Sequence, residues 1–400
     1  MTPPPCEASS TRFAMYEPEF AADPHAAYAR MRQVHGPLVP VLLAPGVPAT
    51  LVIGYDKARS ILHDEVRFPG DPRRWEQTVP DTCPVRPMME WRPNALRSAG
   101  PERVRYRAAN TAALGAVDQH ALLALVEKTA ADLIAGFRAT GHADLLAQFA
   151  WPLTFRVLNN LMGCPDARGR RIADGMAQVF DGVHAVRGNQ ILAQAVTEQV
   201  AFRRAQPGDD ITSRLIAHGA RLDDDEMAHQ LVTLYGAGIE PLVNLIVNTL
   251  LKMLTDETFC GDVHAGGATV RQALDAVLYW DPPLANYCLS YPPYPVNLDG
   301  YLLPADQPVV ISMAGCNNDP ALGRVAGDRA HLAWSAGPHA CPARSHAYLI
   351  AETAITYVLD ALPEMDLACQ PRELTWRPGP FHRALTALPV SFTPTAPLTN

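Results

Sequence analysis

The chain has 400 residues, of which 48% are hydrophobic, so it is long enough to bury a large apolar core. Its formal net charge is -8, and no block of lysine and arginine offsets this acidic excess. These values argue against a surface that binds nucleic acid or another polyanion.

The N-terminal stretch MTPPPCEASSTRFAMYEPEF lacks the charged and then apolar pattern of a signal peptide. No apolar run approaches the ~18 residues that cross a bilayer. We therefore expect a flexible leader over residues 1–15 and a cytoplasmic protein without a membrane partner. Eight cysteines are scattered without a C-x-x-C pair, which argues against a zinc ribbon, a redox dithiol or a disulfide framework.

Residues 48–64, PATLVIGYDKARSILHD, predict an apolar strand, a turn at Gly54 and Tyr55, and then a helix. Residues 70–101 carry five prolines before Pro101 and no clean period, so we expect a long loop there. Long loops in compact domains tend to be functional. Helical periodicity dominates from Pro101 to Gly219, with helices expected over 102–117, 121–140 and 149–163.

The longest helical pattern covers residues 223–257, with acids at its start and apolar residues almost all round, so it predicts a central buried helix. A further helix over 268–280 should stop at Asp281, Pro282 and Pro283. Short strands and hairpins are expected over 291–315. The expected fold is mostly α with small β-sheets, as one domain over residues 16–400.

Cys341 follows Gly337, Pro338, His339 and Ala340 and precedes a helical run over 343–362. The positive end of a helix stabilises a thiolate, so this position suits an anionic metal ligand. A buried structural thiol fits the position about equally well.

The segment WSAGPHACPA resembles the haem-binding loop of the cytochrome P-450 family, the haem-thiolate monooxygenases, whose motif is Phe-Gly-x-Gly-x-His/Arg-x-Cys-x-Gly. Gly337, His339 and Cys341 match, while Trp334 stands for Phe and Ser335 and Ala343 replace glycines. YDKARSILHDEVRFPGDP, GPERVRYRAAN, AGIEP, WDPP, NNDP and RALTALPV resemble further family segments in the right order. The resemblance covers nearly the whole chain and implies the family's helical bundle, with a long central helix over the haem.

This resemblance implies haem b as cofactor, with Cys341 as its axial thiolate, because a thiolate favours O–O cleavage at haem iron. It implies that Arg103, Arg107 and His339 pair with the haem propionates. Arg103 replaces the usual histidine, and solvated surface charge is the alternative for all three. The remaining residues that the motifs place at the haem are Ala237, Gly238, Trp334, Gly337 and Ala343.

The family's acid and threonine in the long helix appear here as Glu240 and Pro241. Proline cannot donate to the carbonyl of Ala237, so we expect a kink, at a cost of ~3 kcal/mol unless that carbonyl finds a partner. An opened carbonyl beside Gly238 could hold water and form a relay through Glu240. Alternatively, Pro241 only shapes the pocket, and water or the substrate delivers the proton.

The Glu-x-x-Arg pair of the family is also absent, because Ala276 and Tyr279 occupy its positions. The arginine of the family's Asn-Arg-Asp-Pro is replaced by Asn318. Losing one member of a buried ionic triad costs ~3–5 kcal/mol, whereas replacing all members by neutral groups can be harmless. The chain resembles actinobacterial members that lack Glu-x-x-Arg.

By resemblance, the substrate pocket should be lined by the 70–100 loop, the long helix, the strand after Pro283 and the last hairpin. The candidates are Met88, Met89, Trp91, Leu234, Leu284, Asn286 and Leu385, any of which could equally be ordinary core. Methionines and a tryptophan suit a flat aromatic ligand, with Asn286 as an amide partner. We expect hydroxylation or radical aryl coupling of an aromatic or peptide-derived metabolite, such as a tryptophan-containing cyclic dipeptide.

The resemblance implies molecular oxygen, a ferredoxin and a ferredoxin reductase as partners. Arg324, Arg329 and Arg344 could meet an acidic ferredoxin, or they could be scattered solvated charges. Two alternatives to the oxidase remain. One is a non-catalytic binding or recruiting protein, and the other is a peroxide-driven enzyme that uses Glu240 as its acid-base group.

Overall fold

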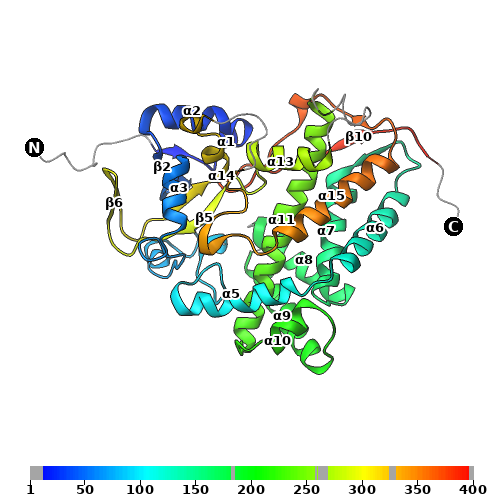
Figure 1. Cartoon of the computed structure of the whole chain (residues 1–400), viewed down its shortest axis with the longest axis horizontal. Helices are drawn as coiled ribbons and strands as arrows, with labels where there is room; N and C mark the ends of the chain where they lie inside the picture. The colour runs from blue at the N-terminus through cyan, green and yellow to red at the C-terminus, as the bar shows by residue number, and fades with distance from the viewer. Residues whose placement is uncertain (1–11, 182–184, 257–258, 260–268, 324–329, 396–400) are drawn as a thin grey trace, which may run out of the picture. The chain divides into compact units, whose positions relative to one another are not determined.

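The computed structural model describes residues 12–181, 185–256, 259, 269–323 and 330–395 (Figure 1). The chain forms two compact units that interleave along the sequence. The β unit holds residues 1–103, 284–341 and 376–383, and the helical unit holds residues 104–283, 342–375 and 384–400. That residues 16–400 form a single domain stays a prediction.

The β unit is built on a five-stranded sheet in the order β1-β2-β3-β8-β5. β1 pairs parallel with β2 and β3 pairs parallel with β8, while β2–β3 and β5–β8 are antiparallel. A separate hairpin joins β6 and β7. The strand bounds are Phe13–Ala14 for β1, Leu38–Ala44 for β2, Val47–Val52 for β3, Asn286–Ser290 for β5, Val296–Leu298 for β6, Tyr301–Leu303 for β7 and Val309–Ser312 for β8.

Short helices complete the β unit. They are α1 (Pro18–Ala22), α2 (Pro24–His35), η1 (Trp75–Thr78), α4 (Arg86–Met89), α14 (Met313–Asn317), η3 (Pro320–Leu322), η4 (Gly337–His339) and α3 (Tyr55–Leu62). The strand and helix predicted over 48–64 are confirmed as β3 and α3. The 70–101 segment is largely irregular, as expected, with only η1 and α4 before α5 begins at Gly100.

The predicted flexible leader over residues 1–15 extends too far along the chain. Phe13 and Ala14 form β1, and the side chain of Met15 is fully buried while its N–H donates to Leu42 O over 2.9 Å. Burying an apolar side chain and pairing a backbone donor both favour order here.

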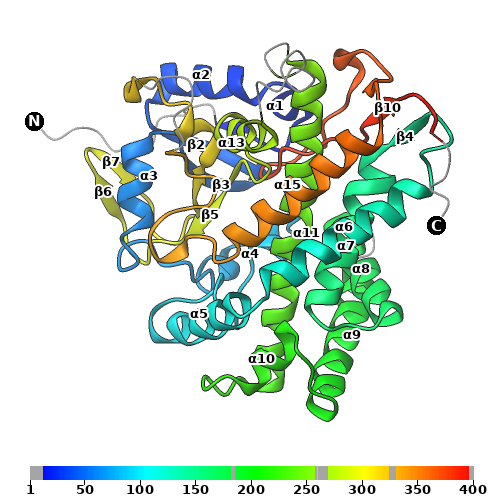
Figure 2. The ribbon, with the colours of Figure 1, turned by 45° about the vertical axis from the view of Figure 1, so that its right-hand side comes forward.

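The helical unit contains the remaining helices and a three-stranded sheet in the order β4-β10-β9, in which both pairings are antiparallel. Its helices are α5 (Gly100–Gly115, which begins in the β unit), α6 (Gln119–Ala135), the π-helical turn η2 (Leu146–Ala150), α7 (Trp151–Leu161), α8 (Asp166–Asp181), α9 (Ala185–Ala205), α10 (Ile211–Ala217), α11 (Asp224–Thr255), α13 (Val270–Trp280), α15 (Arg344–Ala361) and η5 (Pro371–Glu373). Its strands are β4 (His142–Asp144), β9 (Asp366–Leu367) and β10 (Pro389–Ser391). The helix α15 lies beside α6 (Figure 2).

The predicted long helix is confirmed as α11. Asp223 caps it through a capping box, accepting from Glu226 N while the Glu226 carboxylate accepts from Asp223 N. From Leu242 to Leu250 every side chain is buried, and α11 packs against α7, α9, α13 and α15. Its length and apolarity would allow it to span a membrane, but 56% of its most apolar window is buried inside the protein, as in a central core helix.

Candidate functional site

The loop that ends at Cys341 is tightly wound. Cys341 N donates to Trp334 O over 2.8 Å, and Ala340 N donates to Gly337 O over 3.1 Å, closing the turn η4. The helix α15 begins three residues after the cysteine, at Arg344, and Ala343 is its N-cap. The sequence prediction of a cysteine just ahead of a helix is therefore confirmed.

The Cys341 loop is bound closely to the end of α3. Gly337 has φ +62°, and a Cβ built there would lie 2.5 Å from the backbone oxygen of Leu62. The ring of His339 similarly approaches Gly70, whose added Cβ would lie 3.4 Å from the ring carbon Cε1. Only glycine fits the first position, because it needs both a left-handed backbone and no side chain.

The same loop keeps one face partly open. Every residue from Ala333 to Ala343 retains partial exposure, including the large ring of Trp334. An aromatic ring and small residues around a partly exposed thiol are surroundings of the kind in which a flat apolar group binds.

A second thiol, Cys288, lies near this loop, and sequence reasoning did not place it there. It sits at a bulge in β5 with φ +49°. Burial raises the pKa of the Cys288 thiol to about 11, the Ser335 hydroxyl opposes this, and the nearby Cys341 adds to it. A thiol with such a pKa stays protonated and unreactive at neutral pH.

Two of the predicted propionate partners share one carboxylate. Arg103 Nε lies 2.6 Å from Glu65 Oε1, and His339 Nε2 lies 3.2 Å from the same oxygen. Arg103 Nη1 also donates to Pro338 O over 3.1 Å. The structure thus brings Arg103 and His339 together, and it adds Glu65, which sequence reasoning missed because an acid in a turn after a helix resembles any solvated charge. Arg107 follows one turn later on α5 and is half-buried.

The predicted residues of the long helix lie along one stripe of α11. Leu234, Ala237, Gly238 and Pro241 recur at helical spacing and are all at least partly exposed, in contrast to the buried run that follows. A Cβ on Gly238 would lie 2.9 Å from Leu158 Cδ1 of α7, so α7 packs closely against this stripe.

The helix α11 continues through Pro241 without interruption. Glu240 is partly exposed, and its carboxylate accepts from Asn244 Nδ2 over 3.2 Å. Whether the Ala237 carbonyl holds water stays a prediction.

The 70–100 loop is held by a buried arginine that sequence reasoning also missed. Arg97 is 5% exposed and donates to Met88 O and to the Tyr287 hydroxyl, and Tyr291 donates to Met89 O over 3.3 Å. Burial alone would lower the pKa of Arg97, but the phenols of Tyr287 and Tyr291 raise it, so the side chain stays charged.

The predicted substrate residues differ in accessibility. Met88, Trp91 and Leu284 are partly exposed, whereas Met89, Asn286 and Leu385 are buried. Asn286 accepts from the Tyr28 hydroxyl over 2.9 Å and donates to Pro380 O over 3.0 Å, so both ends of the amide predicted to meet a substrate already bind the protein. The Trp91 indole N–H is buried without an acceptor in the described part of the chain, and Arg73 lies 5.2 Å above its ring.

The positions of the missing ionic triad are neutral and packed. Ala276 and Tyr279 are partly buried on α13. Asn317 is 1% exposed and accepts from Leu332 N over 2.8 Å, while Asn318 donates to Ala314 O over 2.9 Å.

Comparisons with known proteins agree on one family, although no family model matches the chain. The chain is 30% identical over 388 residues to the cytochrome P-450 monooxygenase PikC of Streptomyces venezuelae, covering 93% of this chain and 92% of that protein. It is 28% identical over 383 residues to the 2-hydroxy-5-methyl-1-naphthoate 7-hydroxylase of Streptomyces carzinostaticus, covering 90% and 92%. Among solved structures it is similar to CYP154C4 from Streptomyces sp. W2061, with a TM-score of 0.87, 27% identity and coverage of 95% and 98%.

Proposed function

Because the chain belongs to the cytochrome P-450 family, whose members are haem-thiolate monooxygenases, we propose that Cys341 is the axial ligand and that the protein oxidises a small aromatic or peptide-derived metabolite in the bacterial cytoplasm. The observation that carries the proposal is the wound loop that presents a partly exposed thiol three residues before α15. Bound haem supplies oxygen activation, and a thiolate ligand favours O–O cleavage.

The residues present fit a haem. Cys341 would supply the thiolate, and Arg103, Arg107 and His339 would hold the propionates by charge-assisted hydrogen bonds. In the β unit, partly exposed surface on the Cys341 loop supports contact of Trp334 and Gly337 with a flat face of the group. In the helical unit, the partly exposed α11 stripe supports the haem contacts that the resemblance implies for Ala237 and Gly238, and the resemblance implies the same for Ala343.

An aromatic substrate is supported by the partly exposed residues of the 70–100 loop. Trp91 offers a ring for stacking and a buried N–H that lacks an acceptor, so a substrate oxygen or nitrogen would satisfy it. In the β unit, Met88 and Leu284 would add apolar contacts. The role of Leu234 in the helical unit rests on the resemblance alone. A relative named as a naphthoate hydroxylase adds support for an aromatic scaffold, which we extend to tryptophan-containing cyclic dipeptides, oxidised by hydroxylation or aryl coupling.

Glu240 and Pro241 would govern proton delivery. Proline at 241 leaves the Ala237 carbonyl without its helical donor, and an exposed carbonyl can hold a water molecule. The Glu240 carboxylate, held by Asn244, lies one turn along the same helix and would pass a proton to that water. Replacing Glu240 by Gln should slow turnover with ferredoxin while leaving substrate affinity unchanged; equal turnover would assign proton delivery to solvent or substrate.

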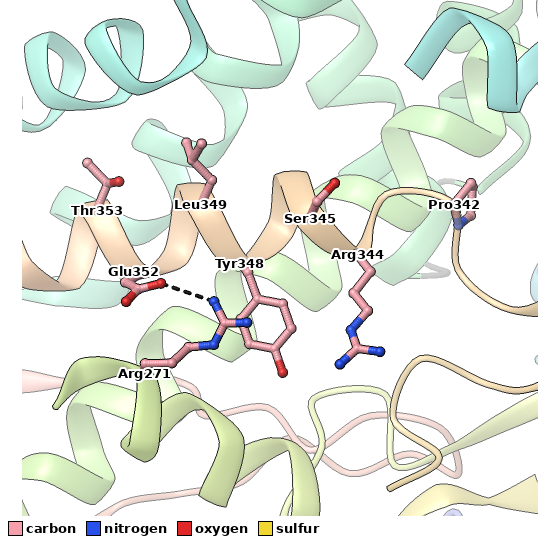
Figure 3. A pocket seen from close by; sticks show the side chains of 8 residues that line it. All are labelled: Arg271, Pro342, Arg344, Ser345, Tyr348, Leu349, Glu352 and Thr353. Atoms are coloured by element: carbon pink, nitrogen blue, oxygen red, sulfur yellow. Dashed lines mark hydrogen bonds and ion pairs between the residues drawn. The ribbon is translucent and has the colours of Figure 1, made fainter. Parts of the chain in front are cut away.

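An acidic ferredoxin is proposed as electron donor at a pocket of the helical unit (Figure 3). The pocket has a volume of about 620 Å³ and lies between α13 and α15. Arg271 pairs with Glu352 at 3.2 Å and lies 3.6 Å above the Tyr348 ring. Arg344 is exposed and has no carboxylate partner in the described part of the chain, so an acidic protein would supply one. Arg324 and Arg329 lie outside the described residues.

The ferredoxin proposal is tested by Arg344→Ala, with the exposed Arg372→Ala as control. We expect Arg344→Ala to raise the KM for ferredoxin several-fold with little change in kcat, as loss of a steering charge does. An unchanged KM, or the same change in both variants, would exclude this docking site. Turnover with peroxide alone would instead support the peroxide-driven alternative.

The axial-ligand proposal is tested by the dithionite-reduced carbon monoxide difference spectrum of wild type and Cys341→Ser, with Cys369→Ser as a control at another partly exposed thiol. We expect a thiolate-type Soret band that only Cys341→Ser loses. A folded protein that takes up no haem when haem is abundant would refute the proposal and favour the binding or recruiting alternative.

A further inference from the structure

Glu65 occupies an unusual place for a turn residue. It follows α3, and its oxygen Oε1 lies between Arg103 Nε at 2.6 Å and His339 Nε2 at 3.2 Å. The Arg103 side chain is only 7% exposed, whereas those of Glu65 and His339 are 31% and 20% exposed. A nearly buried guanidinium therefore depends on this carboxylate for its charge balance.

Glu65 is linked to the Cys341 loop through both of its partners. Arg103, which pairs with Glu65, donates from Nη1 to Pro338 O. The next residue in the chain, His339, contacts Glu65 directly. Because each member restrains the next, moving the carboxylate would move the side chains of Arg103 and His339 and the turn η4 that leads to Cys341. Gly337 packs tightly against Leu62 O, so the same turn is held against α3. This helix ends at Leu62, three residues before Glu65.

The neighbouring carboxylate does not take part. Asp64 accepts from Arg67 N over 2.9 Å and pairs with the Arg67 guanidinium, as expected for a local surface interaction. Two adjacent acids in one turn therefore have different tasks, and only Glu65 faces the Cys341 loop.

We propose that Glu65 is a positioning residue for the haem propionates, because it fixes Arg103 and His339 in one arrangement before the cofactor binds. This inference rests on the proposed function, in which these two side chains meet the propionates. Arg103 has five N–H groups, so it can keep Glu65 and Pro338 O as acceptors and still bind a propionate. Pre-organised donors lose less conformational freedom on binding, which strengthens haem retention.

The test compares wild type, Glu65→Gln and the control Asp64→Asn as holoproteins, measuring haem transfer to excess apomyoglobin and the ferric/ferrous reduction potential. Loss of the pairing in Glu65→Gln should speed haem release about threefold or more, whereas Asp64→Asn should match wild type. Glu65→Gln should also raise the reduction potential, because it removes a negative charge near the propionates. A purely structural role would raise the potential no more than Asp64→Asn does, because that control removes a charge from the neighbouring residue.

The outcomes separate cleanly. Equal haem release and equal potential in Glu65→Gln and wild type would overturn the inference, and so would slower release, which would make Glu65 a competitor of the propionates. If Glu65→Gln does not accumulate, Glu65→Asp replaces it. The aspartate side chain is too short to reach both Arg103 and His339, so release at the wild-type rate would again overturn the inference. A wild-type protein that binds no haem would refute the proposed function itself.

Discussion

Gly337 is the position of the Cys341 loop that tolerates a side chain least, so Gly337→Ala is a sharp test of the loop's geometry. Its φ of +62° is left-handed, and an added Cβ would meet Leu62 O at 2.5 Å, a backbone atom that cannot rotate away. Ser335, two residues earlier, has φ +60° and already carries a side chain. The two positions therefore share their backbone strain but differ in available space.

The expected loss of stability in Gly337→Ala follows from the left-handed backbone and from the clash with Leu62 O. A left-handed backbone costs a non-glycine residue about 1–2 kcal/mol. The clash adds about 1–3 kcal/mol, as for other overpacked sites, so Gly337→Ala should lower the free energy of unfolding by about 2–5 kcal/mol. For Ser335→Gly the relief of strain is offset by about 0.5–1 kcal/mol of extra chain entropy, so stability should change by no more than about 1.5 kcal/mol.

The assay is urea unfolding of the haem-free variants, followed by haem titration monitored at the Soret band. We expect Gly337→Ala to unfold at lower urea and to bind haem more weakly, while Ser335→Gly behaves like wild type. If Gly337→Ala matched wild type in both measurements, the tight contact between the turn and α3 would not constrain the loop, and the reasoning would be refuted.

Three further predictions concern the β unit. Tyr28→Phe removes the buried hydrogen bond to Asn286 and should cost about 1–2 kcal/mol in urea unfolding, with no change in the far-UV spectrum. Burial, with a smaller contribution from Arg377, lowers the pKa of His382 to about 4, so the folded state binds its proton more weakly than the unfolded state. Stability should therefore fall as pH drops from about 6.5 to 4, by about 1–3 kcal/mol, and His382→Gln should flatten a pH series of melting temperatures in that window. Arg32→Lys keeps the charge, but its single nitrogen cannot stand both where Nη2 donates to Ile53 O and Gly315 O and where Nε faces Asp319, so it should cost about 1–3 kcal/mol in the same unfolding assay; a loss below about 0.5 kcal/mol would contradict this.

The helices and the ligand loop were predictable because local signals agree there. The acids at the start of α11 act as its capping box, and its apolar residues are buried as their all-round pattern required. The apolar run and the turn at Gly54 and Tyr55 predicted β3 and α3 in the same way. Residues 16–47, in contrast, were left undivided, although they form α1, α2 and β2.

What sequence reasoning missed depends on contacts between distant segments. Glu65 and Arg97 acquire their roles only when partners 38 or more positions away come together, as Arg103 does for Glu65 and Tyr287 for Arg97. The bulge at Cys288 could not be predicted either. Its left-handed φ occurs at a cysteine, whereas glycine or asparagine usually marks such a backbone in the sequence. Asn286 shows the opposite error, since an amide that looked available to a ligand is used within the fold.

The absence of Glu-x-x-Arg leaves open what secures the Asn-Asn-Asp-Pro segment, and the β unit supplies an answer of its own. Asp319 accepts from Tyr55 N over 3.0 Å and lies 3.7 Å from Arg32 Nε. Arg32 also donates to Ile53 O and Gly315 O, over 2.8 and 2.9 Å, so one guanidinium joins α2, the end of β3 and α14. Because two backbone carbonyls and Asp319 hold Arg32, its charge is balanced without any other charged side chain. The neutral residues Ala276 and Tyr279 therefore leave no buried charge unpaired. The aspartate of the segment is thus kept with a cation from another element, which explains how the family's loop can persist after its ionic triad is lost.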